Sequence, residues 1–415
     1  MTRRQKRFLI GGVVILSLAG GIGLVFHRST RQALLRAEDF LFRRMQVTRQ
    51  EDGLYRFFYI TNRSPGTFDG DLGERFTNQR ADELHFGSYD VEIEPSLGLS
   101  SIFNPTKWFR DEEIAVRHER SLSRSELVEQ LGSYIRESPH RSLLVIVHGY
   151  REQFPSALRK TAFVIHVLDL NSPVLLFDWP GDQGGNPLAA YREAVEIASE
   201  SGAELAQTLN LVIEEIRPER LWLLANSMGA QVVADAFGLL YQDAEMADPG
   251  AELEDVVLTA PDVELEAFDT RFQREIRALT RHLTVYVSSN DRALLASRIV
   301  NRGMRRGEST LDTRNVSQDQ LEEAIRLAEL IEPDSDLIAL VDVTPVNRTI
   351  NFHNFYLESP EVFNDLFLRL VNTETPRHRS LYPYRRETAR STGSGPAVAS
   401  ATGRWSGERA RRRSS

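Results

Sequence analysis

A serine with small residues two positions to either side follows an apolar run directly. Ser227 lies in the segment Ala225–Gly229 (Ala-Asn-Ser-Met-Gly), after Leu221–Ala225 and before a helical pattern. A serine hydroxyl is a weak nucleophile until a base removes its proton and the backbone presents it to the substrate. A sharp strand-to-helix turn presents the hydroxyl, and small flanking residues let the turn close. We therefore predict Ser227 as a nucleophile; the alternative is a buried serine in an ordinary turn.

A second candidate loop, His148-Gly149-Tyr150, follows the apolar run Leu143–Val147. If Leu143–Val147 is a strand of the same parallel sheet as Leu221–Ala225, the loop after it supplies one main-chain N–H to the oxyanion formed on the substrate. The residue after the nucleophile supplies the other. We expect the amides of Tyr150 and Met228 to form this oxyanion hole. Because His148 precedes the serine in the chain, we expect its imidazole to shape the loop and to transfer no proton.

The catalytic base is predicted by elimination among nine histidines: His27, His85, His118, His140, His148, His166, His282, His353 and His378. The chain order in this type of site is serine, acid, histidine, and only the last three histidines follow Ser227. His282 opens a strand, and His378 lies in a tail. His353 follows the last strand-like run and precedes a helix, which makes it the predicted base; a polar loop histidine is the alternative.

Two acids compete for the remaining position. Asp291 follows the strand-like run Leu283–Ser289, and Asp262 follows Val256–Ala260. A carboxylate that orients the imidazole must stand at the carboxyl end of a strand, and both do. Asp291 is favoured because its strand comes just before the last one; Asp262 is the alternative acid, and whichever is not catalytic would cap its loop.

A mostly parallel sheet with helices on both faces must position these residues. From Ser142 onward, short apolar runs alternate with helical patterns, which is typical of an α/β fold. The predicted strands are Leu143–Val147, Val174–Phe177, Leu221–Ala225, Val256–Ala260, Leu283–Ser289 and Leu337–Val343. The predicted helices are Ser125–Ile135, Ala190–Ile216, Gln231–Tyr241, Gln318–Ile331 and Pro360–Val371.

The chain divides into four predicted parts: 1–28, 29–140, 141–375 and 376–415. The first contains Phe8–Phe26, an uncharged stretch of about 28 Å as a helix, enough to cross a bilayer. A cleaved signal peptide is the alternative, with a shorter apolar stretch. The basic residues before the stretch favour an exported body. Residues 29–140 form an entry segment that packs on the core of 141–375, with strand-like runs at Tyr55–Ile60 and Val91–Glu94.

Composition excludes several classes of site. The chain has no cysteine, so a disulfide framework, a thiolate zinc site and a cysteine nucleophile are excluded. Residues 1–36 carry +7 and residues 376–415 carry +8. Because the net charge of the whole chain is −9, the body between them carries about −24. An acidic body argues against nucleic-acid binding. The basic tail, rich in Arg, Ser and Gly, is predicted to be disordered.

Taken in order, these motifs resemble a bacterial α/β-hydrolase family of unknown function over residues 55–370. The motifs are Tyr59–Arg63, Phe86-Gly87, His148–Tyr150, Phe177–Pro180 with Tyr191, Ala225–Gly229, Ala260–Asp262, Ser288-Ser289 with Asp291 and Leu294, and His353. The resemblance implies an α/β-hydrolase fold with Ser227, Asp291 and His353 as the triad. This chain departs from the family pattern at Arg151, Gly181 and Asn226.

The sequence thus predicts a serine hydrolase that acts on an ester or a related acyl compound. His353 would deprotonate Ser227, and Asp291 would hold the imidazole in the right tautomer. We expect a small-molecule acyl substrate, a membrane contact through the N-terminal helix, and no metal or organic cofactor. The opposing hypothesis is a non-catalytic, membrane-anchored interaction scaffold that keeps the fold, because a fold does not determine a function.

Overall fold

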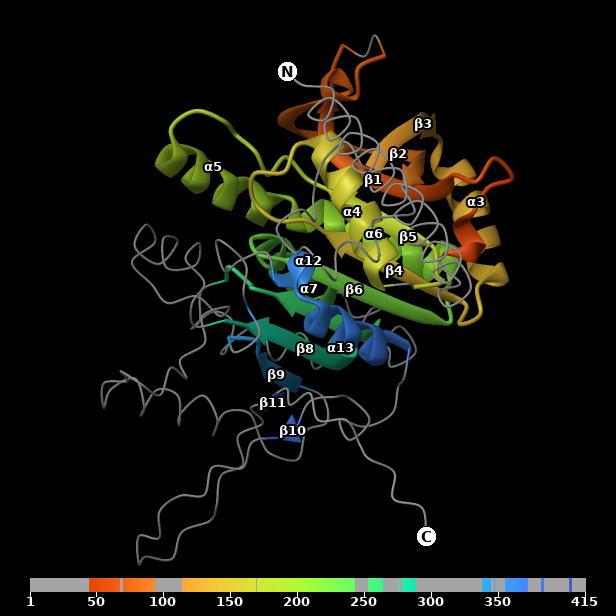
Figure 1. Cartoon of the computed structure of the whole chain (residues 1–415). Helices are drawn as coiled ribbons and strands as arrows, with labels where there is room; N and C mark the ends of the chain where they lie inside the picture. Colours follow the sequence, from red (N-terminus) through yellow and green to blue (C-terminus); the bar gives the residue numbers. More distant parts are fainter. Residues whose placement is uncertain are drawn as a thin grey trace, which may run out of the picture.

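The computed structural model describes residues 45–67, 70–93, 114–168, 170–242, 253–263, 275, 278–288, 338–344, 347, 355–371, 382–383 and 403–404. Its centre is one sheet in which nine strands of the described residues follow the order β3-β2-β1-β5-β4-β6-β7-β8-β9 (Figure 1). The predicted mostly parallel α/β sheet is confirmed.

Six strands form the parallel part that the apolar runs predicted. They are β4 (Ser142–Val147), β5 (Val174–Asp178), β6 (Arg220–Asn226), β7 (Leu253–Thr259), β8 (Thr280–Val287) and β9 (Ile338–Asp342). Each pairs in parallel with its neighbours, for example Val145 with Leu223 across β4 and β6. Nearly all residues of β4 to β7 are buried, because helices cover both faces of the sheet. The carboxyl ends of these strands therefore share one edge.

The entry segment continues this same sheet. β1 (Tyr55–Pro65) pairs in parallel with β5, and it pairs antiparallel with β2 (Phe76–Ile93), which in turn pairs antiparallel with β3 (Ile114–Leu122). The sequence predicted only the start of β1 and the end of β2, since β2 between Thr77 and His85 is mostly polar and partly exposed, and charged residues interrupt β3. These three strands lie at one end of the sheet (Figure 1).

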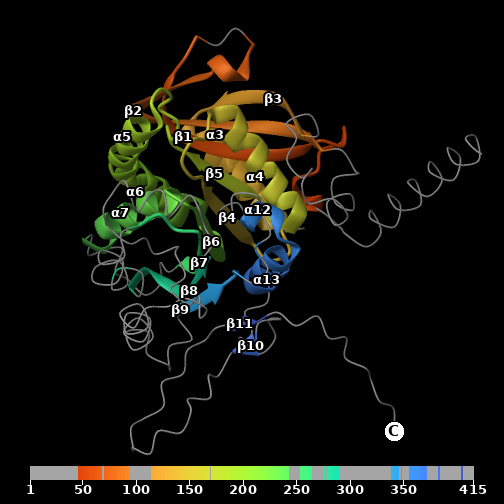
Figure 2. The ribbon, with the colours of Figure 1, turned by 60° about the vertical axis from the view of Figure 1, so that its left-hand side comes forward.

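Helices cover the two faces of the sheet as two separate layers (Figure 2). The helices of one layer contribute side chains to one apolar core cluster. They are α3 (Arg124–Glu137), α5 (Pro187–Glu200), α6 (Gly202–Leu211) and α7 (Gly229–Gln242). The other packs on a cluster with residues of α4 (Phe154–Leu168), α12 (Phe355–Glu358) and α13 (Pro360–Val371). Three short elements complete this part of the chain: η1 (Gln46–Thr48), η2 (Leu72–Glu74) and the π-helical turn η4 (Val212–Ile216).

Local sequence signals explain where helices begin and end. Ser123 caps α3, and Glu126 returns a hydrogen bond to the Ser123 amide, which completes a capping box. The predicted helix Ala190–Ile216 is divided at Ser201 into α5 and α6 and ends in the π-helical turn. Helix α4 was not predicted, although its face toward the sheet is apolar.

Several predicted features lie outside the described residues: the N-terminal helix over Phe8–Phe26, the helix Gln318–Ile331, Asp291 and His353. Among the residues that are described, no helix has the length and apolar character needed to cross a membrane. In the basic tail, the structure describes only the short pair β10 (Tyr382–Pro383) and β11 (Gly403–Arg404).

Candidate active site

Ser227 occupies the sharp turn between β6 and α7. Its φ angle is 53°, in the left-handed region that non-glycine residues rarely adopt. Such a conformation costs about 1–3 kcal/mol, and residues held in it cluster at functional sites. A strained serine between a strand and a helix is the geometry of a nucleophile elbow. The residue is 6% exposed, so the turn places its side chain in a nearly closed environment.

Three main-chain hydrogen bonds hold Ser227 in this conformation. Its N–H donates to the Thr259 carbonyl at 2.9 Å, while its carbonyl oxygen accepts from the amides of Ala230 and Asp262, each at 3.0 Å. Two of these partners belong to β7 and the loop that follows it. The adjacent strand therefore holds the elbow in place and offsets its backbone strain.

The loop after β4 lies directly against the elbow, and two glycines permit this contact. A Cβ atom on Gly229 would lie 2.5 Å from the carbonyl oxygen of His148, a distance no side chain tolerates. A Cβ atom on Gly149 would lie 3.0 Å from the Ser227 Cβ. The structure thus brings together the two loops that the sequence singled out.

The amides of Tyr150 and Met228 flank the elbow. Within the described part of the chain, neither N–H donates a hydrogen bond to a protein acceptor. Met228 is 1% exposed and stands at the amino end of α7, where the first amides of a helix have no partner in the helix. Unpaired, buried N–H groups are rare, and at a helix N-terminus they attract negative charge. Both amides can therefore receive an oxyanion.

Asp262 contacts the backbone of the elbow, and its carboxylate accepts a hydrogen bond from a tyrosine. Its Oδ2 accepts a hydrogen bond from the Tyr191 hydroxyl at 2.6 Å, and its amide contacts Ser227 as described above. The Tyr191 ring packs edge-on against Tyr150, with ring centroids 5.4 Å apart. In the sequence, Tyr191 of α5 appeared only as part of a motif. No sequence pattern indicated that it would lie beside Ser227.

Asp291 and His353 remain predictions, because both lie outside the described residues. Their flanks are described: β8 ends at Val287 shortly before Asp291, and α12 begins at Phe355 just after His353. Beyond the ends of β8 and β9, the side-chain amide of Asn347 donates through Nδ2 to the Ser288 hydroxyl at 2.9 Å. Because β8 and β9 run parallel to β6, both chain segments leave the sheet at the edge that carries Ser227. Within the described ranges, no cluster of acidic and histidine side chains is placed to hold a metal ion.

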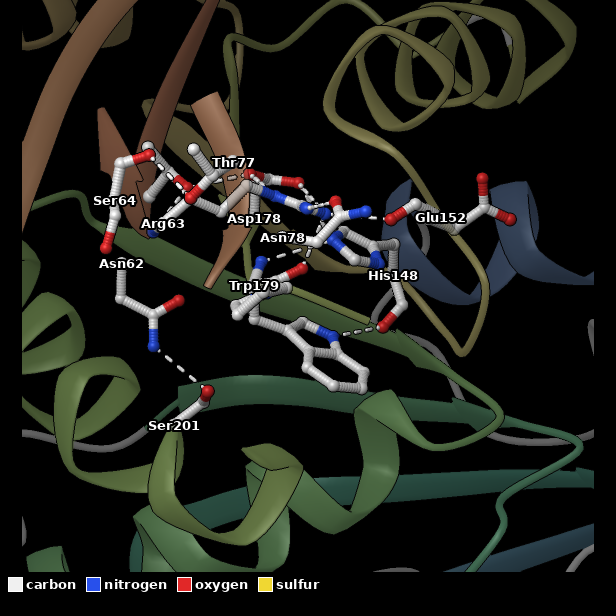
Figure 3. A network of polar contacts seen from close by, with 12 residues as sticks. Asn62, Arg63, Ser64, Thr77, Asn78, His148, Glu152, Asp178, Trp179 and Ser201 are labelled. Atoms are coloured by element: carbon white, nitrogen blue, oxygen red, sulfur yellow. Dashed lines mark hydrogen bonds and ion pairs between the residues drawn. The ribbon is translucent and has the colours of Figure 1, made fainter. Parts of the chain in front are cut away.

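The imidazole of His148 belongs to a buried network (Figure 3). Its Nε2 lies 3.0 Å from Asp178 Oδ1 and 3.2 Å from the Trp179 amide, and its Nδ1 lies 2.9 Å from the Gly149 carbonyl oxygen. The ring stacks on the Trp179 indole, with an interplanar angle of 7°. Both ring nitrogens thus have partners within the loop and β5, as expected for a residue that shapes the loop.

Asp178 also binds Arg63, and both side chains are fully buried (Figure 3). The guanidinium donates to Oδ2 at 2.7 Å and to Oδ1 at 3.2 Å, and the Thr61 hydroxyl adds a bond of 2.7 Å. Burial raises the pKa of Asp178, but the charge of Arg63 and the hydrogen bond with His148 outweigh it, so the net pKa is lowered. The sequence showed both residues only as parts of motifs.

The chain belongs to a family of α/β hydrolases. The model of the family described as "Alpha/beta hydrolase of unknown function (DUF900)" matches residues 123–371, which include β4 to β9, the turn at Ser227 and the loop after β4. The predicted resemblance is therefore confirmed, and the family supports hydrolase activity in general.

One solved structure similar to this chain is the Pyrococcus furiosus esterase Pf2001. The two chains are 12% identical, with a TM-score of 0.31, over 55% of this chain and 80% of the esterase. At that TM-score the likeness defines neither the fold nor the substrate. No curated protein matches this chain.

Proposed function

We propose that this protein is a serine hydrolase that cleaves a carboxylic ester or a related acyl compound through Ser227. The observation that carries the proposal is the left-handed backbone of Ser227 at the end of β6, with φ of 53°, beside two amides that donate to no acceptor among the described residues. Strain held in place by three hydrogen bonds at one serine is expected where that serine must be presented to a substrate.

In the proposed reaction, His353 takes the proton of the Ser227 hydroxyl as its oxygen attacks the acyl carbon. The carbonyl oxygen of the substrate becomes an oxyanion, which the amides of Tyr150 and Met228 bind. His353 then gives the proton to the leaving alcohol, and an acyl-enzyme remains. Water then attacks the acyl carbon while His353 takes its proton; the bond to Ser227 breaks, the acid leaves, and His353 returns the proton to the Ser227 oxygen.

Asp291 is the proposed acid that holds the imidazole of His353 in the productive tautomer. Its place after β8 supports the assignment, since β8 runs parallel to β7 and β6 and its carboxyl end points to the same edge. Asp262 is the alternative acid, and its position beside Ser227 keeps that alternative open.

We further propose that Phe8–Phe26 anchors the protein in a membrane and that the hydrolase domain lies on the extracytoplasmic side. Support comes from the length of the uncharged stretch and from the basic residues before it.

A fluorophosphonate probe tests the proposed nucleophile. The probe should label the wild-type protein and leave Ser227→Ala unlabelled, because it phosphonylates only an activated serine. A matched control is Ser142→Ala, which removes another buried serine. Ser142 lies at the amino end of β4, away from the edge that carries Ser227, so the variant should leave labelling intact. An unlabelled wild-type protein, or equal labelling of Ser227→Ala, would favour the non-catalytic scaffold. A chain-length series of p-nitrophenyl esters then ranks acyl groups.

A further inference from the structure

The family match begins at residue 123, yet a residue of β1 reaches the loop that carries the Tyr150 amide. We propose that Arg63, together with Asp178, is a positioning residue for the loop of residues 148–152, here called the oxyanion loop, so that the N-terminal strands are part of the active centre. This inference rests on the proposed function for its catalytic meaning. It assigns to residues 45–122 a role that the matched region does not include.

The first step is the coordination of Arg63. Besides its paired contact with Asp178, its Nη1 donates to the Asn78 side chain at 2.9 Å. Its Nη2 donates to the carbonyl oxygens of Trp179 at 2.7 Å and Glu152 at 2.8 Å. Every guanidinium nitrogen thus has an acceptor, on β2, at the end of β5 and in the residue after it, and in the loop before α4. A planar fork of five donors can make these contacts together, whereas a lysine ammonium cannot.

The second step runs from β5 to the near side of the oxyanion loop. Asp178 Oδ1 contacts His148 Nε2, and the Trp179 indole N–H donates to the His148 carbonyl at 2.8 Å. The ion pair therefore fixes Asp178, and Asp178 with Trp179 fixes the residue that precedes Gly149. His148 is 5% exposed, so water does not replace these contacts readily.

The third step concerns the far side of the loop. The Arg151 amide donates to the Gly181 carbonyl at 2.8 Å, and Arg151 has a left-handed φ of 63°. The next carbonyl, that of Glu152, is the one that Arg63 binds. A Cβ on Gly181 would lie 2.9 Å from the Gly149 carbonyl oxygen, so the β5 loop also packs closely on this segment. The Tyr150 amide thus lies between two attachment points, and Arg63 contributes to both.

Position matters here because an oxyanion donor acts only at hydrogen-bond distance. Removing one such donor lowers kcat by roughly 10²–10³ in a studied protease, and a displacement of about 1 Å can cost about 10². Such a loss falls on the transition state, so it lowers kcat more than it raises KM. A general loss of stability does not produce that pattern per folded molecule.

The chain supplies a matched control on the same strand. Arg56 also makes a paired contact with an aspartate of the sheet, at 2.7 and 2.8 Å to the two oxygens of Asp90. Arg56 lies near the amino end of β1, roughly 20 Å from Arg63 along the strand. Arg56→Lys and Arg63→Lys therefore make the same chemical change near opposite ends of one strand.

The test compares kcat, KM and inhibition by a trifluoromethyl ketone in full-length wild-type protein, Arg63→Lys and Arg56→Lys. Active-site titration with the fluorophosphonate probe normalises kcat to reactive sites. We expect Arg63→Lys to lower kcat per site by roughly tenfold or more and to weaken the ketone in parallel, with KM little changed. Trp179→Phe, which removes the indole donor and shrinks the ring that stacks on His148, should show the same pattern more weakly. Arg56→Lys should remain close to wild type.

Hydrogen exchange of residues 148–152 provides a readout that needs no catalysis. Arg63→Lys should speed exchange there, and Arg56→Lys should not. Unchanged kcat and ketone inhibition in Arg63→Lys, or equal losses in both lysine variants, would overturn the proposal. If wild-type protein neither reacts with the probe nor cleaves esters, the proposed function fails. In that case equal exchange in the two variants also refutes positioning by Arg63, whereas faster exchange only in Arg63→Lys retains it.

Discussion

The amide of Asp262 donates a 3.0 Å hydrogen bond to the carbonyl oxygen of Ser227, while the Asp262 carboxylate accepts one from the Tyr191 hydroxyl. Asp262, the alternative acid, is thus hydrogen-bonded both to the backbone of Ser227 and to Tyr191, whose ring packs on Tyr150. A change at Asp262 can reach the site through either contact, even if Asp262 never touches the catalytic histidine.

Substitution of the two acids should separate their roles. Asp291→Asn is expected to lower kcat by about 10⁴, as loss of the triad aspartate does in a studied serine protease, because the histidine then prefers the wrong tautomer. Asp262→Asn should have a much milder effect. Steady-state kinetics with a p-nitrophenyl ester measures both, and the reverse ranking assigns the acid to Asp262.

Tyr191→Phe isolates the structural part of the Asp262 contact. The variant loses the hydroxyl bond to the carboxylate but keeps the ring that packs on Tyr150. We expect the free energy of unfolding to fall by about 1–2 kcal/mol and kcat to fall less than in Asp291→Asn. Urea unfolding and kinetics on the same preparation give both values. A loss of kcat as large as that in Asp291→Asn would instead place Tyr191 in the chemistry.

Gly229→Ala should disrupt the elbow. The new Cβ would lie 2.5 and 2.8 Å from the carbonyl oxygens of His148 and Val147, which are backbone atoms that cannot move aside cheaply. We expect a loss of about 1–3 kcal/mol in unfolding free energy together with loss of probe labelling. Gly132→Ala on α3 is the control, because its Cβ would meet only the flexible Arg136 side chain, and helix propensity favours alanine by up to about 1 kcal/mol. Equal effects of both variants would contradict the steric explanation.

Acid should weaken the Arg63–Asp178 pair. The folded-state pKa of Asp178 lies below its ordinary value of 3.8, so the unfolded chain binds the proton more readily. The stability from this group is therefore complete above about pH 4 and is lost as pH falls through the lower, folded-state pKa. Breaking a buried pair costs about 3–5 kcal/mol, so Asp178→Asn should be less stable than wild type at pH 7 by that amount. Urea unfolding between pH 7 and pH 3 should show this difference shrinking in acid; a constant difference would contradict it.

The proposed anchor predicts how the protein fractionates. Full-length protein should sediment with membranes and resist high-salt extraction, because the attachment would be apolar and not electrostatic. Deletion of residues 1–28 should release a folded protein that still reacts with the fluorophosphonate probe. N-terminal sequencing decides against an anchor if the mature protein starts near residues 27–30. Protease added to spheroplasts tests sidedness, and a hydrolase domain that is cut only after lysis would be cytoplasmic.

Local patterns in the sequence predicted the parts of the fold that depend on burial. The runs that became β4, β5 and β6 are almost wholly apolar, because parallel strands are covered on both faces. Strand β3 escaped prediction since its charged residues, such as Arg117 and Glu119, interrupt any apolar pattern. The motif around Ser227 indicated the elbow through its small flanking residues and its place between an apolar run and a helical pattern.

The contacts that support the proposed oxyanion loop could not be predicted in the same way. Arg63, Asp178 and His148 are far apart in the chain, and their contact depends on β1 pairing with β5 and β5 with β4. A buried arginine and an exposed one look alike in a sequence. Only the pairing order of the sheet shows that Arg63 lies beside the loop.

The position of β3 at the outer end of the sheet also bears on self-association. An edge strand exposes unpaired main-chain groups to which another chain can add, and charged side chains or bulges suppress this. β3 carries Arg117, Glu119 and Arg120, and its pairing with β2 shifts register between Ser88 and Asp90. A chain cut back to the start of the family match would instead end the sheet at β5, whose residues Val174–Phe177 are apolar and buried in the intact protein. The N-terminal strands therefore also shield the hydrolase sheet from aggregation through its edge.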